Sequence, residues 1–255
     1  MRIIVFSDIH GNPYACQAVL QAIRKEGECD AVAAAGDLCL GGSDPGACVD
    51  MLAESGVQAV FGNTEEYLFC PDQVPPDQLH KDMWDRVHPV ALWVLKKLSR
   101  DHMNWLKALP FELKYQPSSP KNGGLQVVHA NPSNNELMIL PAEMEQKMLW
   151  EEIRQPDDDP EMASVLSGVK AEILAFGHFH YTFERMWGDL RLVDVAPCSM
   201  PGVDFDPRAR YTIFTHEEDK WYITRKWVTY DSNKELGALE RSDMPFKEVF
   251  IRYFK

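Results

Sequence analysis

Seven residues with metal-binding side chains occur in short motifs, each of which follows a short apolar run. They are Asp8, His10, Asp37, Asn63, His129, His178 and His180. A ligand set of carboxylate, imidazole and amide without thiolate favours Mn²⁺, iron, Zn²⁺ or Co²⁺ and disfavours a site for magnesium alone. Seven ligands exceed what one ion with an open position needs, but they suit two ions that share a carboxylate. Because two such ions can hold the attacking and leaving oxygens of a phosphoryl transfer, the set predicts a two-metal phosphoesterase centre.

Each motif follows a predicted strand. The apolar runs 2–6, 31–35, 57–61, 125–128 and 173–176 lead into SDIHGN, AGDLCLGG, FGNTEE, VVHANP and FGHFH, respectively. In open α/β sheets the ligand site lies beyond the carboxyl ends of the strands, so we expect these groups to converge. Residues two apart in an extended segment point to the same side, so Asp8 with His10, and His178 with His180, can each present two ligands together. One such motif is a weak signal, but five strand ends in this order are a strong one.

The elements that must position these groups alternate between strand and helix at the start of the chain. Strand patterns at 2–6, 31–35 and 57–61 enclose helical patterns at 13–24 and 47–54, which predicts a parallel sheet covered on both faces. Segment 65–109 contains no strand pattern and is expected to form a helical cap or side layer. A hairpin is predicted for 111–115 and 125–129, around PSSPKNGG.

Further elements are predicted in the second half. They are a helix at 143–154, a solvated loop at 156–160, antiparallel strands at 190–195, 211–216 and 221–230, and a helical stretch at 234–254 interrupted near Pro245. Strands on both sides of the helical segment favour two packed sheets with helices outside. We expect one domain spanning 1–255.

Composition limits the function classes. Hydrophobic residues make up 45% of the chain and charged residues 25%, as in ordinary globular proteins. A net charge of −13 disfavours broad nucleic-acid binding, although a bound metal can reverse the local field for a small phosphoester or nucleotide. No apolar run is long enough to span a membrane. The six cysteines form no CxxC pair, so we expect reduced thiols and a cytoplasmic protein.

The ordered motifs resemble those of the calcineurin-like metallophosphoesterase superfamily: Asp-x-His, Gly-Asp, Gly-Asn-His-Asp/Glu, a lone His and Gly-His-x-His. The resemblance extends from residue 1 to about 230. Segment 65–109 and the tail VAPCSMPGVDFDPRARYTIF are similar to the prokaryotic YfcE-like phosphodiesterase branch. The resemblance implies a four-layer α/β/β/α sandwich of two mixed sheets with a helical cap insertion.

The same resemblance implies roles for the ligands. It assigns one ion to Asp8, His10, Asp37 and His180, and the other to Asp37, Asn63, His129 and His178. The nucleophile would be a hydroxide bridging two divalent ions, with manganese favoured and iron, zinc or cobalt as alternatives. Asp37, Asn63 and His129 are the expected catalytic residues.

Thr64 departs from the family pattern, which often has a proton-donating histidine directly after the metal-binding asparagine. A threonine hydroxyl is a poor general acid near neutral pH. We therefore favour phosphodiesters or nucleotide phosphoanhydrides as substrates, since their leaving groups need protonation least. Four residues of segment 65–109 are alternative acids, although packing or surface roles are expected more often for such residues: Glu65, Tyr67, His88 and His102.

Two other functions stay open: a phosphomonoesterase or protein phosphatase, and a metal-binding module without catalysis. Arg208 and Arg210 are candidates for holding a phosphate or for a surface role, and Asn12 for orienting the site or capping a helix. The tryptophans of segment 65–109 favour a core role over base stacking. The C-terminal amphipathic stretch is expected to pack on the sheet or to form a homo-oligomer contact.

Overall fold

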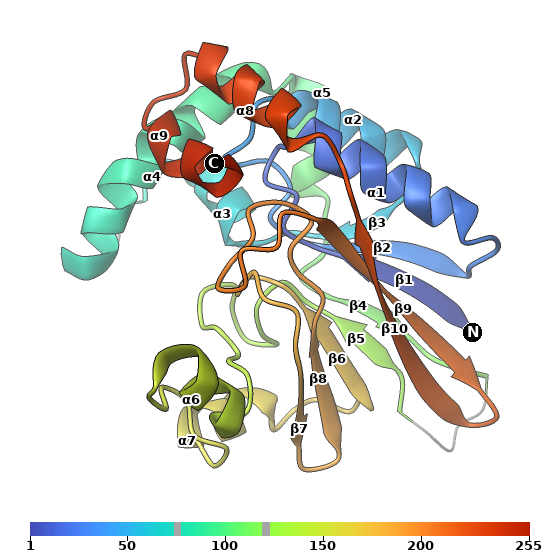
Figure 1. Ribbon diagram of the computed structural model, residues 1–255. Coiled ribbons are helices and arrows are strands. Elements are labelled where there is room, and N and C mark those ends of the chain that lie inside the picture. Colours follow the sequence, from blue (N-terminus) through green and yellow to red (C-terminus); the bar gives the residue numbers. More distant parts are fainter. Residues whose placement is uncertain (74–77, 119–122) are drawn as a thin grey trace.

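The computed structural model describes residues 1–73, 78–118 and 123–255, which form two five-stranded mixed sheets between layers of helices (Figure 1). The first sheet has the order β10-β9-β1-β2-β3 and consists of Arg2–Phe6 (β1), Ala31–Ala35 (β2), Gln58–Val60 (β3), Ala209–Glu217 (β9) and Lys220–Val228 (β10). The second has the order β4-β5-β6-β8-β7 and consists of Leu113–Tyr115 (β4), Leu125–Val127 (β5), Ile173–Phe176 (β6), Glu184–Trp187 (β7) and Leu190–Asp194 (β8). The predicted sandwich of two mixed sheets is confirmed.

Each sheet combines three parallel strands with two antiparallel ones. Strands β1, β2 and β3 run parallel, as do β5, β6 and β8. Strand β9 pairs antiparallel with β1 and β10, β4 with β5, and β7 with β8. The carboxyl ends of the parallel strands therefore lie at one end of the sandwich, where the predicted ligands follow them.

Successive side chains of β1 point to opposite faces of the first sheet and so contact different layers. Ile3 and Val5 contact the second sheet through a shared core, whereas Ile4 and Phe6 join the core under the helices. Within the described part of the chain, seven α-helices cover the outer face of the first sheet: Pro13–Lys25 (α1), Pro45–Glu54 (α2), Asn63–Phe69 (α3), Gln78–Lys97 (α4), Arg100–Lys107 (α5), Ser232–Arg241 (α8) and Lys247–Ile251 (α9). Helices Glu143–Trp150 (α6) and Pro160–Leu166 (α7) lie beside the second sheet. In the described residues, no helix has the length and apolar character needed to cross a bilayer.

The predicted helical segment 65–109 is present as α3, α4 and α5. Val90, Ala91 and Val94 join the core beneath α1 and α2, so most of the segment is a side layer. Trp84 and Trp93 are only 6% and 7% exposed, which supports the core role expected for them. Residues 74–77 of this segment lie outside the described residues, as do 119–122 of the predicted hairpin.

Several sequence expectations need correction. Helix α6 ends at Trp150, and the C-terminal helical stretch consists of α8, α9 and a 3₁₀ turn, Arg252–Phe254 (η1). Strand β8 pairs with β6 and β7 in the second sheet, while β9 and β10 belong to the first. Strand β7 was not predicted because apolar and polar residues do not alternate clearly in its sequence, ERMW. Helix α7 was also missed: it begins at Pro160, the last residue of the predicted loop, and the Asp159 side chain accepts from Met162 N–H at its N-terminus.

Candidate metal centre

The seven predicted ligands meet at the end of the sandwich where β1, β2, β3, β5 and β6 terminate. Backbone hydrogen bonds join the loops that carry them: the Asp8 amide donates to the Gly36 carbonyl at 3.1 Å, and the His10 amide to the Asp37 carbonyl at 2.9 Å. Within the second sheet, the Gly177 amide donates to the His129 carbonyl at 2.7 Å, and between the sheets the His178 amide donates to the Asp8 carboxylate at 3.1 Å. The ligand-bearing loops thus form one connected layer, which explains why strand ends far apart in sequence present their side chains together.

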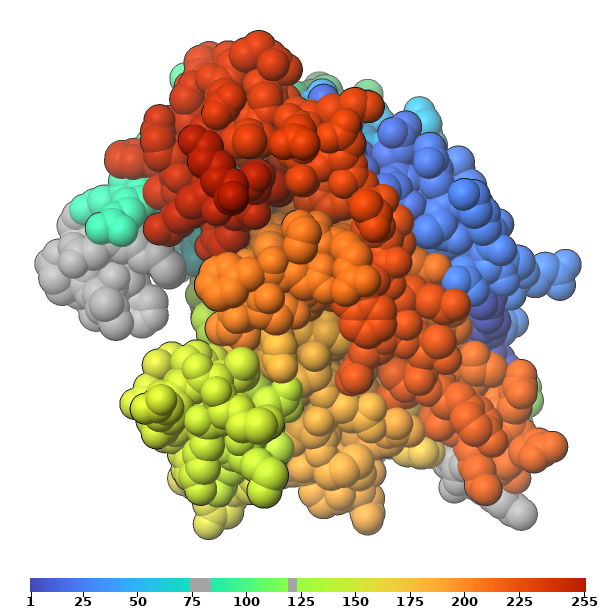
Figure 2. All heavy atoms as spheres, viewed as in Figure 1, coloured from blue at the N-terminus to red at the C-terminus, as the bar shows by residue number. Residues whose placement is uncertain are grey.

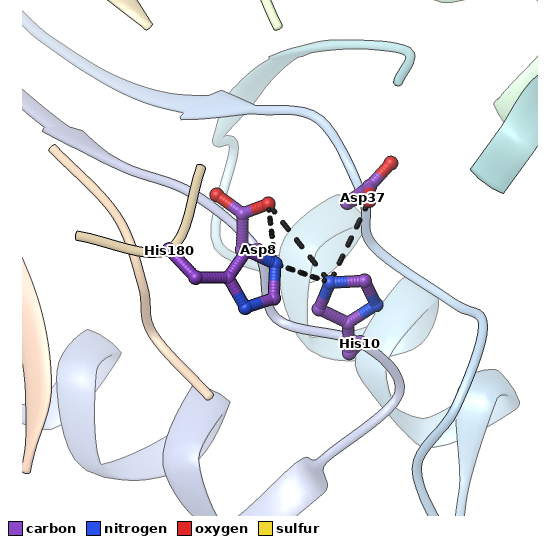
Figure 3. Close-up of side chains that lie close together, drawn as sticks. All are labelled: Asp8, His10, Asp37 and His180. Carbon is purple, nitrogen blue, oxygen red and sulfur yellow. Dashed lines mark hydrogen bonds and ion pairs between the residues drawn. The ribbon is translucent and has the colours of Figure 1, made fainter. Parts of the chain in front are cut away.

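The side chains form two groups that share Asp37. Asp8, His10, Asp37 and His180 can place ligand atoms within 4.8 Å of one another (Figure 3), and so can Asp37, His129 and His178. Asp37 Oδ2 lies 3.5 Å from His10 Nε2, whereas Asp37 Oδ1 lies 3.3 Å from His129 Nε2. One carboxylate therefore directs one oxygen to each group, which is the arrangement a bridging ligand needs.

Asn63 joins the second group, because its Oδ1 lies 3.0 Å from His129 Nε2. Within the first group, His180 Nε2 lies 3.1 Å from Asp8 Oδ1. All seven predicted residues are thus brought together, in the two sets that the family resemblance implies.

Backbone carbonyls orient the four imidazole rings. The ring nitrogens that contact carbonyls are Nδ1 of His10 (Leu40, 2.7 Å), Nδ1 of His129 (Ala35, 2.8 Å), Nδ1 of His180 (Met200, 2.6 Å) and Nε2 of His178 (Glu136, 3.1 Å). A carbonyl only accepts hydrogen bonds, so each contacting nitrogen carries the proton and the other nitrogen presents a lone pair to the cluster. Carbonyl contacts of this kind are typical of metal-binding histidines.

The inward-facing nitrogens lie close to one another. His10 Nε2 and His180 Nε2 are 2.9 Å apart, and His129 Nε2 and His178 Nδ1 are 3.2 Å apart. Two unprotonated nitrogens at such a distance repel each other unless a proton or a cation lies between them. The donor set therefore fits a pair of divalent metal ions.

Five of the seven residues have left-handed backbone conformations. The φ angles are +56° at Asp8, +50° at His10, +54° at Asp37, +71° at His178 and +58° at His180. Such conformations are uncommon outside glycine and cost on the order of 1 kcal/mol or more each. Close packing adds a further constraint, since a Cβ atom at Gly62 would overlap Asp37 Oδ1 and one at Gly177 would overlap Asp8 Oδ2. Local strain concentrated at one cluster is typical of a functional site.

Burial and mutual charge determine the protonation of the cluster. Burial alone would raise the pKa of Asp8, but His180, with His129 and His10, holds that pKa below its usual value. Burial raises the pKa of Asp37, against the influence of His10. Burial lowers the pKa of His178 to about 4, so this imidazole is neutral near pH 7. Neutral imidazole and ionised carboxylate are the metal-binding forms, and a bound cation would lower the pKa of Asp37 further.

Two neighbours of Asn63 on α3 hold Asp37 in place. The Thr64 hydroxyl and amide donate to Asp37 Oδ1 at 2.9 and 3.1 Å. The fully buried Glu65 carboxylate accepts four backbone N–H groups, from Asp37 (3.0 Å), Leu38 (2.9 Å), Cys39 (3.2 Å) and Gly62 (2.9 Å). The expectation that Glu65 is a substitute acid is therefore corrected, because both of its oxygens are engaged in fixing the Asp37 loop. A glutamate three residues after a helix N-cap is a recognisable capping signal, and it could have indicated this role.

Tyr67 is the alternative acid that contacts a predicted ligand through its hydroxyl. Its hydroxyl accepts from Asn63 Nδ2 at 3.4 Å and donates to Glu136 Oε1 at 2.9 Å. This contact directs the Asn63 oxygen toward His129. Burial raises the pKa of Tyr67 well above its usual value, which favours a hydrogen-bonding role. The other two candidates have different partners: His102 contacts Asp50 at 2.9 Å, and His88 stacks on Trp84 at 5.0 Å.

The C-terminal helix α8 also contacts a loop that supports the site. Glu235 on this helix is buried, and it accepts from the Ser43 amide at 2.7 Å and the Ser43 hydroxyl at 2.6 Å. Ser43 belongs to the loop in which Leu40 provides the carbonyl partner of His10. Burial raises the pKa of Glu235 to about 7. Sequence reasoning missed this residue, because a contact across 192 positions leaves no local pattern.

The remaining candidates have structural partners. Arg210 is buried and forms an ion pair with Asp204 at 2.7 Å. Arg208 is exposed and forms hydrogen bonds of 2.6 to 3.2 Å with the Asp206 carboxylate. Neither guanidinium is therefore positioned as a ready phosphate clamp. Asn12 caps α1 by accepting from the Tyr14 and Ala15 amides at 3.1 Å each.

Comparisons with known proteins agree with this fold. An uncharacterized protein of Methanocaldococcus jannaschii is 25% identical over 95% of this chain and 93% of its own length. A metallophosphoesterase from Sphaerobacter thermophilus has a similar structure, with a TM-score of 0.71, 18% identity, and coverage of 100% of this chain and 98% of that one. A hypothetical protein from Pyrococcus horikoshii has a TM-score of 0.72, 18% identity, and coverage of 99% and 97%. The sequence profile described as calcineurin-like phosphoesterase matches residues 1–182.

Proposed function

This chain belongs to the calcineurin-like phosphoesterase family, and we propose that it is a two-metal hydrolase of phosphodiesters or nucleotide phosphoanhydrides. The observation that carries the proposal is the division of the Asp37 carboxylate, whose Oδ2 faces His10 at 3.5 Å while Oδ1 faces His129 at 3.3 Å. A single-metal site would not need two ligand groups on opposite sides of one carboxylate.

The residues have distinct tasks in this proposal. One ion would be held by Asp8, His10, Asp37 and His180, and the other by Asp37, Asn63, His129 and His178. Bound divalent ions, with manganese favoured, would supply an activated water near neutral pH and positive charge toward the phosphoryl oxygens. The protein maintains the lone-pair orientation of each imidazole through its backbone carbonyls and holds Asp37 through Thr64 and Glu65. Asp37, Asn63 and His129 form the proposed catalytic group.

The preference for diesters or anhydrides rests on Thr64. The side chain is 5% exposed, and its hydroxyl donates to Asp37 at 2.9 Å. This position, where the family often has a proton-donating histidine, is therefore used to hold a ligand. Substrates whose leaving groups depart without a proton suit such a site best.

The six free cysteines support the proposed cytoplasmic location.

Hydrolysis of paired chromogenic substrates tests the proposal. Protein loaded with Mn²⁺, Co²⁺ or Zn²⁺ should cleave bis(p-nitrophenyl) phosphate faster than p-nitrophenyl phosphate, and elemental analysis should find two metal ions per chain. Asp37→Ala should abolish turnover and reduce the metal content while circular dichroism stays unchanged. Undiminished turnover in Asp37→Ala would overturn the mechanism, and faster cleavage of the monoester would favour a phosphomonoesterase.

A further inference from the structure

We propose that a groove between the loop after β8 and the C-terminal turn η1 binds the nucleoside part of the substrate. The groove has a volume of about 700 Å³. One wall is formed by Pro201, Phe205 and Pro207, and the other by Arg252, Tyr253 and Lys255. In Figure 2 the loop after β8 (orange) lies directly against the C-terminal segment (red). The inference rests on the proposed function and names the substrate class for that site.

The groove adjoins a loop that supports the candidate metal centre. In the loop after β8, the Ser199 amide donates to the Asp8 carbonyl at 2.9 Å, and the Met200 carbonyl accepts from His180 Nδ1 at 2.6 Å. The Gly202 amide then donates to the His180 carbonyl at 2.9 Å. The wall residue Pro201 therefore lies between two residues that bond to His180. Pro201 directly follows Met200, whose carbonyl orients His180, so the groove adjoins the loop that supports this side chain.

The lining has the chemistry of a nucleotide site. Phe205 is 82% exposed and Tyr253 is 37% exposed, so two aromatic rings are available to solvent. Arg252 and Lys255 add positive charge in a chain whose net charge is −13. The pair of Lys255 with Glu240 is long, at 3.8 Å, and both side chains are largely exposed. Exposed aromatic rings beside cations bind a flat base by stacking and an attached phosphate by charge.

The charges and aromatic rings around the groove support this choice of ligand. Asp204 and Asp206 lie on the same loop, but Arg210 and Arg208 pair with them, so they repel an anion less. Trp84 and Trp93 are buried and offer no open stacking surface. An aliphatic ligand would gain little from the cations, whereas a nucleotide uses both features.

Two esters with the same leaving group test the groove. They are thymidine 5′-(p-nitrophenyl phosphate) and methyl p-nitrophenyl phosphate, measured on the metal-loaded full chain. Phe205→Ala or Tyr253→Ala should lower kcat/KM about ten-fold or more for the thymidine ester and leave the methyl ester unchanged within about two-fold. The matched control is Tyr222→Ala, since Tyr222 is 50% exposed on β10 and lies outside the groove lining. Equal losses for both esters, or no loss for either, would overturn the inference.

A binding measurement separates this inference from the proposed function. Adenosine 5′-monophosphate should bind to the metal-free protein in equilibrium dialysis, and Phe205→Ala should weaken that binding about ten-fold. Arg252→Met should weaken binding of the monophosphate but not of adenosine. If the wild-type protein hydrolyses neither ester yet binds the nucleotide in this pattern, the proposed function fails and the groove stands. If wild-type protein hydrolyses the esters but does not bind millimolar nucleotide, the groove assignment fails.

Discussion

Glu65→Gln is the substitution that most directly tests how the fold holds the bridging ligand. The carboxylate has no exposed surface and accepts four backbone N–H groups, two on each oxygen. A glutamine of the same shape keeps one accepting oxygen and replaces the other with an amide that donates. Two backbone N–H groups then lose their acceptor and face a donor instead.

The cost follows from the number of donors left without a partner. A buried unsatisfied donor costs about 1–3 kcal/mol, so two such donors predict a loss of roughly 2–6 kcal/mol in the free energy of unfolding. Because domains of this kind are commonly stable by only about 5–15 kcal/mol, the variant should fold marginally. Whichever side chain oxygen remains, the Asp37 amide or the Leu38 amide loses its acceptor, so the Asp37 loop should shift and metal binding should weaken.

Urea unfolding of the metal-free protein measures the stability loss, and elemental analysis measures metal content. Glu66→Gln is the matched control on the same helix, since Glu66 is partly exposed and its Oε1 accepts from Asn135 at 3.0 Å. That change should cost about 1 kcal/mol and leave the metal content intact. If Glu65→Gln unfolds within 1 kcal/mol of the wild type and retains its metal, the positioning role of Glu65 is wrong.

Three further predictions concern residues around the cluster. Thr64→Val removes the hydroxyl donor to Asp37 and should raise the dissociation constant for metal about ten-fold in calorimetric titration, whereas Thr64→Ser should bind as the wild type does. Tyr67→Phe should reduce kcat/KM about ten-fold while changing the free energy of unfolding by about 1 kcal/mol or less, because Asn63 loses its partner; a large stability loss would indicate a core role instead. Burial raises the pKa of Glu235 to about 7 from 4.5, so native protein retains a proton that the unfolded chain releases, and this group's stabilisation is lost as the pH rises from 4.5 through 7. The free energy of unfolding of Glu235→Gln, measured relative to the wild type by urea titration of the metal-free proteins, should therefore increase by about 3 kcal/mol from pH 5 to pH 8. A difference between the two proteins that does not change with pH would contradict this assignment.

Sequence patterns were sufficient to predict the sandwich and the side chains that meet at its end. Each of Asp8, Asp37 and His129 directly follows, or nearly follows, a buried apolar run. Because parallel strands end at one edge, a list of strand ends is already a prediction of which side chains meet. The order of strands and helices also predicted the fold, because alternating strands and helices have few arrangements that bury both faces of a sheet. Less regular elements such as β7 left no comparable pattern.

Only the tertiary structure decided what surrounds the ligands. A glutamate two residues after Asn63 could have faced the substrate or the interior, and the packing of α3 against the Asp37 loop turned Glu65 inward. The same packing directed the Thr64 hydroxyl to Asp37, and the fold brought Glu235 to Ser43 from 192 positions away. The periodicity of apolar residues and the order of the strands depend on residues that are close in the sequence, so they can be predicted from the sequence. Side-chain direction and long-range hydrogen bonds depend on how whole layers pack, and a local pattern such as the capping signal at Glu65 indicates only a small part of them.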